Sequence, residues 1–126
     1  MLTGNGRQCF VKTGALDYAE HSDDASYRHF YAAEAENLRL LARAQAVQTP
    51  KVLHATEQFL LLDYIGSGQQ QRDYWSILGQ QLAELHQFQH SQFGLERDNF
   101  CGATPQINGW YEDGFEFFGE RRLLFQ

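Results

Sequence analysis

The chain has 126 residues, 43% of them hydrophobic, and a formal net charge of −6 at pH 7, which suits one domain or part of a larger one. The acidic balance argues against a nucleic-acid or anionic-membrane partner, and no apolar run approaches the ~20 residues of a membrane span. The start lacks the features of a secretory signal. Cys9 and Cys101 make no disulfide framework, so we expect a cytoplasmic protein.

The first part of the chain predicts a small sheet and one long helix. Arg7 to Lys12 is typical of a strand that leaves a hairpin turn at Gly4-Asn5-Gly6. The polar segment from Ala15 to Ser26 is expected to be a loop, and a helix is expected from about Tyr27 to Ala44.

Two further strands and a linker are predicted next. Lys51 to His54 indicates a short strand after Pro50. Gln58 to Tyr64 indicates a longer strand, and because its apolar residues do not alternate with polar ones, we expect it to be buried on both faces. Gly66 to Arg72 follows as a linker.

The last part predicts two helices separated by a loop. Asp73 to His90 carries leucines at helical spacing, and Phe93 to Gly109 is rich in glycine and is expected to be a loop. A second helical pattern runs from about Trp110 to the end, where bulky apolar residues gather. Because a domain seldom stops on an uncovered apolar helix, we expect a fragment or a truncated reading frame.

Lys12 and Glu34 are candidates for handling a nucleotide. Strand alternation puts Phe10 and Lys12 on one face, where Lys12 could reach phosphate oxygens while Phe10 lies against an adenine ring. Taken alone, an ordinary lysine at a strand end is the simpler interpretation. Glu34 changes this balance, because it falls on the helix stripe of Tyr31, Leu38 and Leu41. A carboxylate there needs a cation, and Lys12 is the natural partner; a surface glutamate at the stripe's edge is the alternative.

The position of two more groups of residues indicates their roles. Glu36 shares the outer helix face with Arg39 and Arg43, which favours a solvated role. Leu62, Asp63, Tyr64 and Ile65, where the apolar strand ends, would form an adenine-binding hinge; the alternative is simply a core strand that leads into a loop. A strand lysine, a helix glutamate and then a hinge are the order of a kinase small lobe.

Histidines offer weaker signals. His21-Ser22-Asp23 resembles a kinase catalytic loop but stands before Glu34, where no such loop belongs. His86 and His90 are four residues apart on a helix and could share a metal ion. Since no third ligand is evident, a structural role is favoured and no metal site is expected.

A set of motifs in one order resembles the fructosamine (ketosamine-3) kinase family over nearly the whole chain. The most specific motif is Thr104-Pro105-Gln106-x-Asn108-x-Trp110. The others are Phe10-Val11-Lys12, Ala33-Glu34-Ala35-Glu36-x-Leu38, Thr49-Pro50-Lys51-Val52, Leu62-Asp63-Tyr64, Leu78-Gly79-Gln80-Gln81-Leu82-Ala83-x-Leu85-His86, Phe93-Gly94-Leu95-x-x-Asp98-Asn99 and Phe117-Phe118-x-Glu120-x-Arg122-Leu123. The resemblance implies an α+β, protein-kinase-like fold similar to aminoglycoside and choline kinases. Residues 1–65 would form the small lobe, with an antiparallel sheet and one helix, and residues 66–126 the hinge linker and the first helices of the large lobe.

The resemblance also implies an activity, the phosphorylation by ATP and Mg²⁺ of a sugar hydroxyl on a ketosamine. Lys12 would hold the α and β phosphates, Glu34 would orient Lys12, and the hinge would bind adenine. Asn99 and Trp110 are weaker candidates for contact with the sugar substrate.

The chain departs from the family pattern in ways that bear on activity. It lacks the strand and turn that cover the phosphates, the His-Gly-Asp loop and the later metal-binding Asp. Phosphoryl transfer needs such groups, so we expect no catalytic residue within this chain and no turnover from it alone. Two alternatives stay open: an aminoglycoside- or choline-kinase-like phosphotransferase, and a non-catalytic binding remnant that self-associates and shows no ATP-dependent thermal shift.

Overall fold

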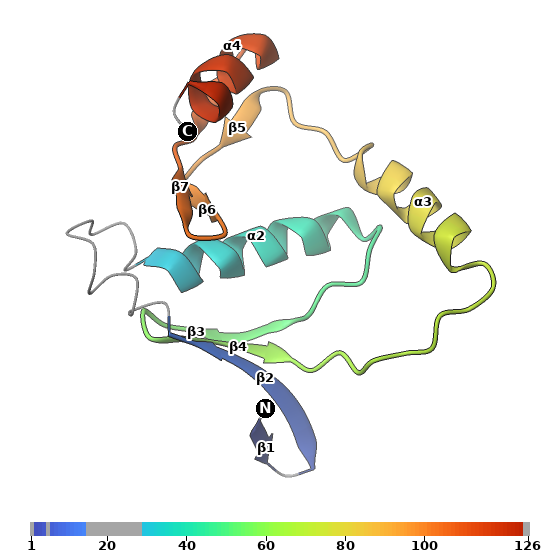
Figure 1. The fold of residues 1–126 in the computed structure, drawn as a ribbon. Coiled ribbons are helices and arrows are strands. Elements are labelled where there is room, and N and C mark those ends of the chain that lie inside the picture. Colours follow the sequence, from blue (N-terminus) through green and yellow to red (C-terminus); the bar gives the residue numbers. More distant parts are fainter. Residues whose placement is uncertain (1, 5, 15–28, 125–126) are drawn as a thin grey trace.

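The computed structural model describes residues 2–4, 6–14 and 29–124 (Figure 1). Its main sheet has four antiparallel strands in the order β1-β2-β4-β3. These strands are β1 (Leu2–Gly4), β2 (Arg7–Thr13), β3 (Val52–Ala55) and β4 (Phe59–Asp63). The expected loop from Ala15 to Ser26 lies outside the described residues. So do His21-Ser22-Asp23, the segment that resembles a kinase catalytic loop, and Asn5 of the predicted turn.

The core lies between this sheet and helix α2 (Phe30–Ala44), which covers one sheet face (Figure 1). Leu60 and Leu62 on β4 are buried against Tyr31 and Ala35 of α2. The prediction that β4 is buried on both faces is wrong, because burial alternates along the strand. Since α2 covers only one face, the intervening residues remain half-buried.

Helix α2 ends as predicted at Ala44, but its core stripe is shorter than predicted. Gln45 adopts a left-handed conformation with φ of 54°, and its N–H donates to the Ala42 carbonyl, which closes the helix. Leu41, expected on the core stripe, is 39% exposed. The buried residues of α2 are Tyr31, Ala33 and Ala35, so the first turns make the core and the last turns do not.

A linker follows β4 and leads to helix α3 (Tyr74–Leu85). The helix is shorter than the predicted Asp73 to His90, because His86 is its C-terminal cap. No residue of α3 is buried within the described part of the chain, so its apolar spacing marks a face without core contacts here. None of the helices in the described ranges is long and apolar enough to cross a membrane.

The predicted loop from Phe93 to Gly109 is wrong, and so is the start of a helix at Trp110. The segment forms two two-stranded antiparallel sheets, β5 with β8 and β6 with β7. The strands are β5 (Phe93–Leu95), β6 (Asn99–Cys101), β7 (Thr104–Gln106) and β8 (Gly109–Tyr111). Strands of three residues are too short to show a period of two in the sequence, and Cys101, expected in a loop, lies on β6.

The helical end of the described chain begins at Asp113, whose carboxylate accepts the N–H groups of Phe115 and Glu116. Helix α4 (Gly114–Phe118) continues into the π-helical segment η2 (Gly119–Leu123). Figure 1 shows the β6–β7 hairpin next to α2, on the side of the helix away from the main sheet.

Candidate functional site

Lys12 and Glu34 meet as the sequence analysis expected. The Lys12 Nζ lies 2.5 Å from Glu34 Oε1, and the two side chains are 43% and 26% exposed. The strand register explains the meeting, because Lys12 is opposite Leu60 and Phe10 is opposite Leu62. Opposite residues in an antiparallel pair point to the same face, so Lys12 and Phe10 share the sheet face that α2 covers.

A hollow of about 380 Å³ lies beside this ion pair, where β4 leads into the linker. Its walls contain all six residues proposed from the sequence for nucleotide contact: Phe10, Lys12, Glu34, Asp63, Tyr64 and Ile65. Leu38, Pro50 and Leu62 complete it. The side chains of Tyr64 and Ile65 are exposed at its rim, and the Asp63 N–H donates to the Lys51 carbonyl over 2.9 Å. The hollow therefore combines apolar walls with one cation at its edge.

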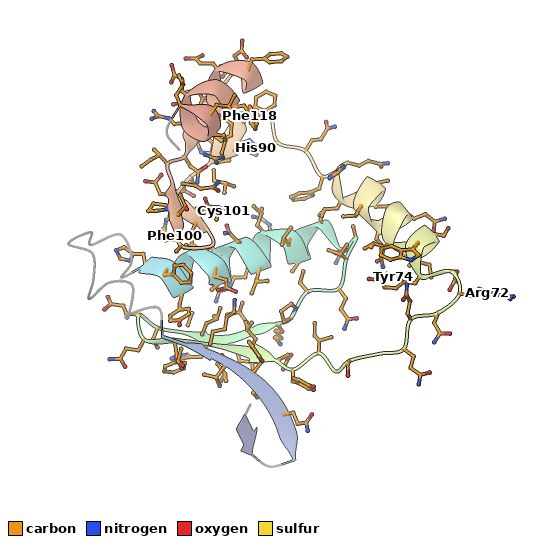
Figure 2. The ribbon with its side chains drawn as sticks, viewed as in Figure 1. Arg72, Tyr74, His90, Phe100, Cys101 and Phe118 are labelled. Atoms are coloured by element: carbon orange, nitrogen blue, oxygen red, sulfur yellow. The ribbon has the colours of Figure 1, made fainter. Side chains whose placement is uncertain are left out.

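A second hollow, of about 220 Å³, lies on another side of the same ion pair. Lys12 and Glu34 line it together with residues from α2 and from the β6–β7 hairpin: Phe30, Asn37, Phe100 and Gly102. Figure 2 shows Phe100 beside the first turn of α2, and the rings of Phe100 and Phe30 have centroids 4.9 Å apart. The hairpin thus reaches the neighbourhood of the Lys12–Glu34 pair.

Asn99 and Trp110 share a separate hollow of about 380 Å³, which Lys12 does not line. Trp110 stacks on His90, with ring centroids 4.3 Å apart and planes inclined by 22°. Asn99 Oδ1 accepts a hydrogen bond from the Asn108 side chain. The structure therefore brings these two weaker candidates together, but not with the nucleotide candidates.

His86 lies at the end of a helix, in line with the structural role favoured for it, whereas His90 lies outside that helix and Glu36 has another partner than the sequence suggested. His86 caps α3, whereas His90 Nδ1 is the acceptor for the Gln92 N–H. Within residues 2–4, 6–14 and 29–124 there is no cluster of three or more His, Cys, Asp or Glu side chains that could hold a metal ion. Glu36, grouped in the sequence with Arg39 and Arg43, forms its ion pair with Arg97 over 2.8 Å.

Asn108 is a structural centre that the sequence analysis did not single out. It is 7% exposed, and its N–H donates to Asp98 Oδ1. Its side-chain amide donates to the Arg97 carbonyl and to Asn99 Oδ1, and its own Oδ1 accepts from Arg122 over 2.6 Å. Asn108 lies inside the most specific motif of the family resemblance, and that motif was the signal in the sequence that could have singled it out.

Comparisons with known proteins identify the family of the chain. The model of the fructosamine kinase family matches residues 1–126. A "Probable ketoamine kinase" of Synechocystis sp. is 36% identical over 97% of this chain and 43% of its own length. One from Vibrio cholerae is 33% identical over 98% of this chain and 45% of its own length.

A solved structure is similar as well. The crystal structure of a "Putative fructosamine-3-kinase" from Haemophilus somnus matches with a TM-score of 0.73 and 30% identity. The match covers 91% of this chain and 38% of that protein. The chain therefore spans less than half the length of these relatives.

Proposed function

Because the chain belongs to the fructosamine kinase family, we propose that it carries the nucleotide-handling part of an ATP-dependent ketosamine kinase. The main support for this proposal is the Lys12–Glu34 ion pair. It lies on the wall of the hollow that Asp63, Tyr64 and Ile65 also line. On this proposal residues 1–65 are the small lobe, and residues 66–126 are the hinge linker and the beginning of the large lobe. The phosphorylated group is a sugar hydroxyl of a glycated amine.

Each residue of the hollow has a distinct task in this proposal. ATP supplies the phosphoryl group when it is bound. Lys12 offers its ammonium group to the α and β phosphates, and Glu34 holds that ammonium in place. Phe10 packs against the adenine ring. Because the Asp63 N–H is already engaged with Lys51, the backbone of Tyr64 and Ile65 is the part of the hinge that meets the adenine edge.

The catalytic and metal-binding groups are a separate matter. Family membership implies Mg²⁺, yet the described residues offer no cluster of acidic or histidine side chains that fits it. We therefore propose that this chain alone gives no turnover. Asn99 and Trp110 remain candidates for sugar contact, on a hollow separate from the Lys12 site.

The two lysines of the chain make a direct test possible. Lys12 and Lys51 are its only lysines, so an amine-reactive adenosine sulfonyl fluoride has one lysine target in the site and one outside it. We expect labelling of Lys12, located by mass spectrometry, to be suppressed by millimolar ATP while labelling of Lys51 is unaffected. Glu34→Gln should reduce the protection, whereas Glu57→Gln, in the exposed β3–β4 turn, should not. Equal ATP sensitivity of both lysines would refute the proposal.

The alternatives make different predictions. A non-catalytic remnant would show neither ATP protection of Lys12 nor an ATP-dependent rise in the melting temperature. An aminoglycoside- or choline-kinase-like activity is not favoured, because both relatives above carry the name "Probable ketoamine kinase". The cytoplasmic location remains a prediction from the sequence.

A further inference from the structure

Helix α2 has a second set of contacts, on the side away from the main sheet. Three residues of the segment 97–100 reach it. The contacts are Arg97 Nη1 to Glu36 Oε1 at 2.8 Å, Asn99 Nδ2 to Asn37 Oδ1 at 3.5 Å, and the Phe100 ring to the Phe30 ring at 4.9 Å between centroids. They lie along the same helix that presents Glu34 to Lys12.

This second interface is open rather than tightly packed. Two hollows, of about 500 Å³ and 380 Å³, border it, and both are lined by Ala33, Glu36 and the residues 97–99. The helix is thus held here by side-chain tips, and close packing does not fix its position on this side. Packed helices can slide or rotate by small amounts at such contacts, so the placement of residues 97–100 bears directly on where α2 lies.

Asn108 in turn fixes that segment. One buried residue bonds three consecutive residues: the Arg97 carbonyl at 3.0 Å, Asp98 Oδ1 at 2.7 Å and Asn99 Oδ1 at 3.0 Å. A buried network in which the partners are satisfied is rigid, because each lost bond leaves a desolvated polar group. The segment is therefore held more firmly by Asn108 than by its own contacts with α2.

We propose that Asn108 is a positioning residue, which fixes residues 97–100 against α2 and thereby keeps Glu34 within reach of Lys12. The two sites are close, since Lys12 and Glu34 share the 220 Å³ hollow with Phe100 and Gly102 of the hairpin. The inference deepens the proposed function and rests on it, because the Lys12–Glu34 pair is the element that the proposed function assigns to nucleotide.

The ion pair can be observed without nucleotide. Reductive ¹³C-methylation of the chain labels Lys12, Lys51 and the N-terminal amine, and a dimethylated lysine keeps its charge and one N–H. Lys12→Arg identifies the Lys12 resonance, and Glu34→Gln gives its position without the ion pair. Asn108→Asp keeps the side-chain size and the oxygen that accepts from Arg122, but removes both side-chain donors. We expect it to move the Lys12 resonance toward the Glu34→Gln position and to weaken ATP protection of Lys12 about two- to five-fold, with Lys51 unmoved.

A matched control and a second variant keep the test decisive. Gln58→Glu makes the same amide-to-carboxylate change at an exposed turn and should leave Lys12 unmoved. Arg97→Glu should shift the Lys12 resonance in the same direction, and the exchange Arg97→Glu with Glu36→Arg should restore it. Both side chains are largely exposed, at 71% and 45%, so this exchange decides the question if Asn108→Asp fails to fold by circular dichroism.

The outcomes separate this inference from the proposed function. A Lys12 resonance that stays at its original position in folded Asn108→Asp and in Arg97→Glu overturns the positioning role. If the resonance moves while ATP never protects Lys12, the positioning role stands and the nucleotide assignment fails. If ATP protects Lys12 but neither variant moves the resonance, the nucleotide assignment stands and the positioning role fails.

Discussion

Gly94 and Gly109 lie so close across the β5–β8 pair that a Cβ on Gly94 would overlap the Gly109 carbonyl oxygen. Both residues have positive φ, +112° and +119°, a conformation that glycine adopts without steric cost. The Phe117 ring would also lie 3.3 Å from such a Cβ. The approach of β5 to β8, one residue from Asn108, therefore depends on the missing side chain of Gly94.

Gly94→Ala should destabilise the chain by about 2–4 kcal/mol, because backbone atoms cannot rotate away from the added methyl and the positive φ becomes strained. Urea unfolding followed by circular dichroism measures this change. Gly79→Ala is the control: Gly79 lies in α3 with open space around it, and alanine should add about 0.5–1 kcal/mol through helix propensity. Equal unfolding midpoints for the two variants would contradict the argument.

Leu60→Ala and Leu61→Ala test the one-sided burial of β4. Leu60 is fully buried against α2, whereas its neighbour Leu61 is half-buried on the other face. Removing the Leu60 side chain should cost about 2–5 kcal/mol of unfolding free energy, because a cavity is left. The Leu61 variant should cost less than half as much. A strand buried on both faces, as the apolar run of the sequence suggested, would give two similar losses.

The main sheet and α2 could be predicted because their signals are local. Arg7 to Lys12, the helix ending at Ala44 and the strand before Tyr64 all have the length and apolar spacing that sequence patterns reveal. The segment from Phe93 to Tyr111 could not, because each of its strands has three residues and its pairing depends on glycines with positive φ. In such a segment tertiary contacts, rather than periodicity, decide the structure.

The candidate site likewise has a part that could be predicted from the sequence and a part that could not. The meeting of Lys12 with Glu34 followed from two simple rules, strand alternation and the cost of an unpaired carboxylate on a core-facing stripe. Asn108 could not be found that way, because its partners, three consecutive residues at 97–99 and Arg122, are brought together only by the fold. The pairing of Glu36 with Arg97 could not be predicted from the residues of the helix surface either, because Arg97 is 61 residues away in the sequence.

Arg122→Met should destabilise the chain by about 1–3 kcal/mol. Arg122 donates to the Ile107 carbonyl at 3.0 Å and to Asn108 Oδ1 at 2.6 Å, so its loss leaves a buried amide oxygen without this donor. Thermal and urea unfolding give the difference. Arg72→Met, on the exposed linker, removes the same charge and should change stability by less than about 0.5 kcal/mol. If both substitutions cost the same, the network around Asn108 contributes no stability through Arg122.

The Lys12–Glu34 pair should show a measurable coupling in a double-mutant cycle of Lys12→Met and Glu34→Gln. Because both side chains are partly exposed, we expect a coupling of about 0.5–1 kcal/mol in the free energy of unfolding. The same cycle on Arg97 and Glu36 should give less, since that pair is more exposed to solvent. Repeating both cycles in ~1 M NaCl should reduce the Arg97–Glu36 coupling proportionally more, because salt screens exposed charges most strongly. A Lys12–Glu34 coupling of zero at low salt would mean that the two groups do not hold each other in solution, and Glu34 could then not orient Lys12 toward a phosphate.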